Sequence, residues 1–81
     1  MTSAMTFSVL DTVVLERDLP KHGLKRGDVG AVVEVYEPDG VVIEFVAASG
    51  RTQAVVALKA TDVRPVAEDD LLTVRRVARS A

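Results

Sequence analysis

The side chains that could carry out chemistry are few in this chain. His22 is the only histidine, and there is no cysteine. A metal site needs three or four converging ligands, and a general base needs a partner nucleophile. Neither arrangement is visible around His22, so we interpret it as an exposed loop residue beside Pro20 and Gly23. The sequence predicts no metal site and no thiol chemistry.

Two carboxylates, Glu34 and Glu44, occupy outward positions of expected neighbouring strands and could form an acid–base pair. Catalytic pairs need surroundings that push their two pKa values apart, and solvated glutamates on a strand face lack such surroundings. We expect these residues to pair with Arg51 or Lys59, or to keep the face soluble. The sequence therefore predicts a protein that is not an enzyme and that holds no cofactor.

A glycine-rich stretch at residues 27–30 could cradle a phosphate only if a Gly-Lys-Ser/Thr ending and a helix followed it. Neither follows, because the stretch leads into a valine-rich segment. Gly23, Gly27 and Gly30 instead mark places where the backbone needs a positive φ or where a Cβ has no room. We expect Asp28 to cap this turn through its own backbone.

The elements that position these residues are short strands. Alternating apolar residues predict strands at 11–15, 29–36, 41–46, 52–58 and 64–66, with one helical turn at 60–63. The second strand is expected to place Ala31, Val33 and Val35 inward and Val32, Glu34 and Tyr36 outward. Leu19 and Leu24 are expected to anchor the long loop at 17–27 to the core.

Length and charge bound the class of protein. The 81 residues suffice for one domain, and ten Lys and Arg stand against twelve Asp and Glu, a net charge of −2. No global field would therefore attract a polyanion. No apolar run approaches the roughly 20 residues that cross a bilayer, and residues 1–10 do not resemble a secretion signal. We expect a cytoplasmic protein with no membrane partner.

Five strands at hairpin spacing, with a long first loop and a helical turn before the last strand, predict an all-β, five-stranded SH3-like barrel. The barrel is expected at 10–66, after a flexible N-terminus at 1–9. The extension at 67–81 begins with acidic and ends with basic residues, which suits a helix dipole, but a strand is equally compatible with Leu72-Thr73-Val74.

Outward positions of the expected barrel carry many apolar side chains, namely Val14, Val32, Val42, Val46 and Val55. A patch of this kind is more than monomers usually leave open, so the extension or another chain should cover it. The predicted partner-binding residues are Val14, Val32, Glu34, Tyr36, Val42, Glu44 and Val55. A basic loop with Arg17, Lys21, Lys25 and Arg26 is the second predicted contact.

Several segments carry a family resemblance: residues 11–15, 18–20, 23–24, 42–45, 58–66 and above all 27–36, with its Gly-Asp-x-Gly-x-Val-Val core. Over residues 10–66 the chain resembles a family of small bacterial proteins classed only as a domain of unknown function. The resemblance implies an SH3-like barrel and assigns no activity. Such small proteins often look like partners of a neighbouring protein, in the manner of an antitoxin or immunity protein.

A weaker likeness runs from residues 25–27 and 30–32 to the KOW motif of ribosomal and transcription-elongation proteins, which implies RNA or ribosome contact. Residues 1–66 hold seven Lys and Arg against nine Asp and Glu, so the basic excess of nucleic-acid modules is missing. The sequence predicts a non-enzymatic protein-binding module whose partner is another protein or a second copy. Its apolar face would supply burial and its basic loop would select an acidic surface; RNA contact through the loop is the alternative.

Overall fold

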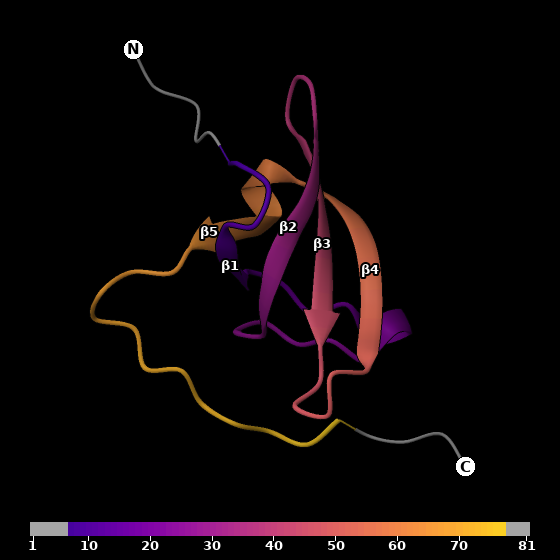
Figure 1. Ribbon diagram of the computed structural model, residues 1–81, viewed down its shortest axis with the longest axis vertical. Helices are drawn as coiled ribbons and strands as arrows, with labels where there is room; N and C mark the ends of the chain where they lie inside the picture. Colours follow the sequence, from indigo (N-terminus) through magenta and orange to yellow (C-terminus); the bar gives the residue numbers. More distant parts are fainter. Residues whose placement is uncertain (1–6, 78–81) are drawn as a thin grey trace.

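The computed structural model of the chain describes residues 7–77 (Figure 1). Five strands form one antiparallel sheet in the order β4-β3-β2-β1-β5. The strands are β1 (Thr12–Leu15), β2 (Val29–Tyr36), β3 (Gly40–Val46), β4 (Thr52–Lys59) and β5 (Val63–Pro65), and two 3-10 turns are η1 (Pro20–His22) and η2 (Ala60–Asp62). The prediction of an all-β protein with five strands is confirmed.

The core lies on the inner face of the sheet. Alternation in β3 works as predicted, because Val41, Ile43 and Phe45 are all buried. The other buried apolar side chains of the core cluster are Phe7, Val13, Leu15, Leu24, Val32, Val56 and Val63. β5 occupies an edge of the sheet and pairs only with β1, which is where Pro65 is tolerated.

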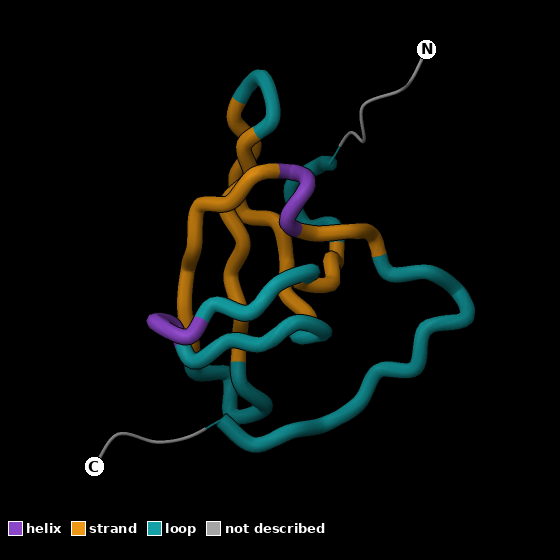
Figure 2. The backbone as a smooth tube through the Cα atoms, turned by 180° about the vertical axis from the view of Figure 1, so that it is seen from behind, coloured by secondary structure: helices purple, strands orange, loops and turns teal. Residues whose placement is uncertain are grey.

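The long loop between β1 and β2 folds back as a hairpin. A bridge joins Leu19 to Leu24, and Leu24 is buried against the core while Leu19 packs beside it. Seen from behind, this loop crosses the sheet on the side opposite to that of Figure 1 (Figure 2). The two predicted anchors are confirmed.

The first half of β2 has the opposite orientation to the predicted one. Val32 is fully buried, whereas Val33 is 38% exposed. The reason is a β-bulge: Val32 pairs with Ile43 and Glu34 pairs with Val42, so Val33 is an extra residue that breaks the alternation. Ala31, expected to face inward, lies opposite the outward-facing Glu44. The prediction that Val32 points outward is therefore wrong.

Glycine is required at two positions around the start of β2, Gly27 and Gly30. A Cβ on Gly30 would lie 2.6 Å from the Cγ2 atom of Ile43 and 2.9 Å from the Phe45 ring, so no larger residue fits there. Gly27 has a φ of 98°, in the region that side chains rarely adopt. Both roles were among those predicted for these glycines.

The C-terminal extension is not a helix over its described part. Residues 67–70 form a turn, and residues 71–77 continue as an extended segment without regular structure. We call residues 67–77 the strap; in Figure 1 it leaves β5, swings outward and returns below the sheet. Of the two alternatives left open for 67–81, neither the helix nor the strand forms in residues 67–77. Residues 78–81 lie outside the described part, as do residues 1–6 of the expected flexible N-terminus.

Candidate functional site

Most of the predicted partner-binding residues share the outer face of β2, β3 and β4. The pairing register of β2 with β3 and of β3 with β4 aligns these residues in three rows that run across the strands. The rows are Ala31, Glu44 and Val55; then Glu34, Val42 and Ala57; then Tyr36, Gly40 and Lys59. Because neighbouring strands are about 4.8 Å apart, side chains within one row are direct neighbours. We call this surface the outer face.

The outer face combines apolar groups with two carboxylates, Glu34 and Glu44, and one cation, Lys59. Val55 is 54% exposed and Tyr36 is 50% exposed, while Val42 and Glu44 are half-buried. The Thr52 hydroxyl donates a hydrogen bond of 2.7 Å to Glu44 Oε2. A hydrogen bond to the Glu34 carboxylate raises the pKa of the Tyr36 hydroxyl, and the negative charge of Glu34 adds to this effect. Neither Glu34 nor Glu44 has an ion-pair partner within residues 7–77, so the expected pairing with Arg51 or Lys59 is absent there.

Two of the predicted residues do not belong to this surface. Val32 lies in the core because of the bulge in β2. Val14 faces the outer side of the sheet, opposite Val29, but is only 7% exposed, because the strap runs beside it. The expectation of a patch built from all these valines is therefore wrong, and the surface that remains open is smaller and more acidic.

The structure does not gather the basic loop into one patch. Arg17 Nη1 lies 3.6 Å from Asp62 of η2, and Arg26 Nη2 lies 3.9 Å from Glu16 Oε1. Lys21 is on η1, which a hydrogen bond of 3.1 Å from Gln53 Nε2 to the His22 carbonyl holds beside the start of β4. The loop and the outer face lie on opposite sides of the sheet (Figures 1 and 2).

Within residues 7–77, Lys21 and Lys25 have no ion-pair partner, whereas Arg17 and Arg26 do. Two of the four cations predicted to select a partner are thus engaged with carboxylates of the chain itself.

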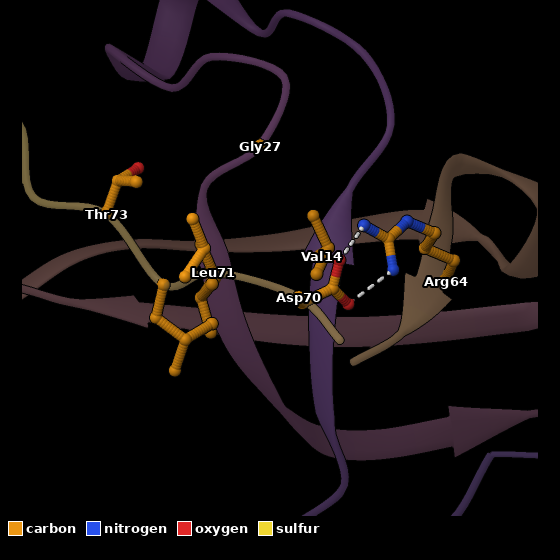
Figure 3. Close-up of a pocket in the computed structure, with 8 residues that line it drawn as sticks. Val14, Gly27, Arg64, Asp70, Leu71 and Thr73 are labelled. Atoms are coloured by element: carbon orange, nitrogen blue, oxygen red, sulfur yellow. Dashed lines mark hydrogen bonds and ion pairs between the residues drawn. The ribbon is translucent and has the colours of Figure 1, made fainter. Parts of the chain in front are cut away.

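Two arginine–carboxylate pairs hold the strap. Arg64 of β5 donates from Nη1 and Nη2 to the two oxygens of Asp70, both at 2.8 Å (Figure 3). Arg75 donates from Nε and Nη2 to Asp28 at 2.7 and 2.6 Å, and also to the Gly23 carbonyl at 2.9 Å. Fork-like pairs of this kind fix geometry as well as charge. They attach the strap at both of its ends.

Both carboxylates titrate below their ordinary pKa. The Arg64 hydrogen bonds, helped by the Ala67 amide, lower the pKa of Asp70 to about 2. For Asp28, burial raises the pKa, but the hydrogen bonds from Arg75 and from the Lys25 amide outweigh it, and the pKa is lowered. The Asp28 carboxylate accepts a hydrogen bond of 2.8 Å from the Lys25 amide, so Asp28 caps the turn as predicted, but through the backbone of Lys25 and not through its own.

The sequence interpretation missed both strap pairs. The signal was the charge order of the tail, with acidic residues before Leu71 and arginines after Val74. That order suits a helix dipole, but it also suits an extended segment with one anchor at each end.

A shallow pocket of about 160 Å³ lies between the strap and the sheet, where Figure 3 shows Leu71 and Val14 near the Arg64–Asp70 pair. Its lining residues are Val14, Gly27, Val29, Arg64, Asp70, Leu71, Leu72 and Thr73. Small-molecule sites usually have about 300–1,000 Å³, so this hollow is too small for one. Residues 7–77 contain no group of three or more His, Asp or Glu side chains that could hold a metal ion. No helix of the described chain is long and apolar enough to cross a membrane.

Comparison with known proteins identifies the family. The family described as Domain of unknown function (DUF4926) matches residues 9–65, and the chain belongs to this family. The family resemblance noted in the sequence is confirmed. No curated protein and no solved structure matches the chain.

Proposed function

We propose that this chain is a non-enzymatic protein-binding module that acts through the outer face of β2, β3 and β4. The observation that carries the proposal is the register, which sets Glu34, Tyr36, Val42, Glu44 and Val55 on one open surface. The strand order, the long first loop and η2 before β5 also support an SH3-like barrel as the scaffold.

The chemistry of the outer face selects the kind of partner. Val55, Val42 and the ring of Tyr36 offer apolar area whose burial favours association. Glu34 and Glu44 bring negative charge to the same surface, and neither has an ion-pair partner within residues 7–77. A protein segment with apolar and basic side chains fits these groups. The sequence predicts a partner with an acidic surface, whereas the structure favours a basic one. The reason is that Glu34 and Glu44, and not the basic loop, adjoin the apolar area.

Three finer expectations stay predictions. A partner encoded nearby, in the manner of an antitoxin or immunity protein, is compatible with a small binding module, and so is a cytoplasmic location. RNA or ribosome contact would rest on Lys21 and Lys25. No observation favours it over protein binding, because the basic side chains are spread along a hairpin and the chain has net charge −2.

Matched charge reversals on the two surfaces test the proposal. The face variant carries Val55→Lys with Glu34→Lys, and the loop variant carries Lys21→Glu with Lys25→Glu; all four positions are exposed, so both chains should fold. The measurement is quantitative mass spectrometry of proteins captured by each immobilised chain from extracts of the source cells.

We expect proteins retained by the unaltered chain to be lost with the face variant and kept with the loop variant. Loss with the loop variant alone would contradict the proposal. If the lost material were RNA, or ribosomal particles that nuclease treatment releases, the KOW-like alternative would take its place.

A further inference from the structure

The second part of the strap, residues 71–77, presents apolar side chains to solvent on a backbone that pairs with no strand of the described chain. Leu71, Leu72 and Val74 are 89%, 64% and 97% exposed. In residues 71–77 no backbone–backbone hydrogen bond joins the strap to any described residue. An extended segment with open amides, carbonyls and apolar side chains is suited to pair with the edge of a β-sheet.

The same molecule has an open edge of matching length. β4 is an outermost strand of the sheet and pairs only with β3, and Figures 1 and 2 show it at the margin, with only η1 beside its start. Its eight residues compare with the seven of segment 71–77. On the outer face of this edge, Val55 is 54% exposed and Ala57 is also exposed.

We propose that the strap of one copy adds to the β4 edge of a second copy, and that the two-fold exchange of straps makes a homodimer. This deepens the proposed function, on which it rests, by naming the partner of the outer face. β4 and β5 lie at opposite edges of the sheet. In its own copy the strap leaves from β5 and, within residues 7–77, comes near β4 only at the Gly23 carbonyl, in the loop beside the start of β4, so the rest of the β4 edge is open to another copy. Each copy gives one strap and accepts one, which closes the assembly at two.

In one antiparallel register, the strap of one copy and β4 of the other bring apolar residues opposite apolar residues and opposite charges together. With Val74 opposite Val55, Leu72 falls opposite Ala57 and Asp70 falls opposite Lys59. The two apolar pairs then lie in the rows that contain Glu44 and Val42, so they extend the outer face. Asp70 and Lys59 carry opposite charges, and the Lys59 side chain has no ion-pair partner within residues 7–77.

The strap loses little when it leaves its own domain. Of its eleven residues at 67–77, only Asp70 and Val77 are half-buried and the rest are exposed. Its attachment therefore depends mainly on the Arg64–Asp70 and Arg75–Asp28 pairs at the surface, and Val14, which the strap runs beside, is the buried apolar side chain that its departure would uncover. Partly solvated ion pairs stabilise a contact only modestly, so a backbone ladder with new apolar contacts can replace them.

Sedimentation velocity over a concentration series tests the exchange with the full-length chain. The unaltered protein should shift from the 8.7 kDa monomer towards twice that mass as concentration rises. Val74→Glu in the strap and Ala57→Glu on the edge should each raise the dissociation constant at least tenfold, because each places a carboxylate in an apolar pair. Leu10→Glu, a matched change at a residue that is 79% exposed and outside the interface, should leave the constant unchanged.

A chain that stays monomeric at all concentrations would overturn the strap exchange, and so would a dimer that both glutamate variants form as tightly as the unaltered protein. Either result is separable from failure of the proposed function. A monomeric chain whose face variant still loses captured proteins keeps the outer face as a binding surface and removes only the second copy as its occupant.

Discussion

Val32 and Val33 are neighbours in the chain, yet the first is sealed in the core and the second is 38% exposed. The bulge in β2 creates this difference, since it inserts Val33 between the pairs Val32–Ile43 and Glu34–Val42. It also decides which residues can bind a partner, because Glu34 and Tyr36 reach the outer face only in the register that follows the bulge.

Truncation of each valine tests this register. We expect Val32→Ala to lower the free energy of unfolding by about 2 kcal/mol, since it removes buried methyl groups and leaves a cavity. Val33→Ala should change it by less than about 0.5 kcal/mol, because the side chain is already partly in water. Urea unfolding of both variants measures the difference; equal losses, or a larger loss at Val33, would contradict the observed register.

Residue roles that depend on local chemistry could be predicted from the sequence. The Asp28 cap, the tight fit of Gly30 and the inward residues of β3 all follow from short-range rules of turns and alternation. The burial of Val32 could not be predicted, because Val32 and Val33 are identical residues and either of them suits either face of a strand. The sequence therefore gives no sign of the bulge. As a result, Val32 was predicted to be on the binding surface, whereas it lies in the core.

At the scale of elements, the strap differs most from expectation. Its charges suit a helix, but its apolar residues Leu71, Leu72 and Val74 do not bury a common stripe against the sheet, and the segment is extended. The strands were predictable because their alternation and turns are local signals. The strap was not, because its conformation depends on Arg64 and Asp28, which are distant in sequence.

Acid should release the first anchor of the strap. The pKa of Asp70 is about 2 in the folded chain against an ordinary value of 3.8, so the folded state favours the ionised carboxylate. The Arg64–Asp70 contact is therefore fully present above about pH 4 and is lost as pH falls from 3.8 towards 2. The pKa of Asp28 is also lowered, so acid should weaken the second anchor, Arg75–Asp28, as well.

Nuclear magnetic resonance of the Asp70 carboxyl and the Arg64 guanidinium across this pH range measures the release. Asp70→Asn should remove the transition, whereas the matched change Asp69→Asn should preserve it. An Asp70 carboxyl that titrates at its ordinary pKa in the unaltered protein would contradict the pairing.

For the whole molecule, the all-β class and the number of strands followed from length, valine content and hairpin spacing. The relation between surfaces did not, because the sequence does not show that the 17–27 loop crosses the sheet on the side away from the outer face. The outer face and the basic loop, which were expected to bind one partner together, are therefore separate surfaces. A partner on the outer face meets Glu34 and Glu44, and the cations of the loop lie elsewhere.

The most direct test of the outer face as the surface that binds a second copy is a dilution series of the full-length, ¹⁵N-labelled chain, followed through its backbone amide shifts. We expect concentration-dependent shifts at Val42, Glu44, Val55 and Ala57 and in residues 71–77, with the amide shifts of Lys21 and Lys25 unchanged. Shifts confined to the loop at residues 17–27, with the outer face unchanged at every concentration, would contradict it.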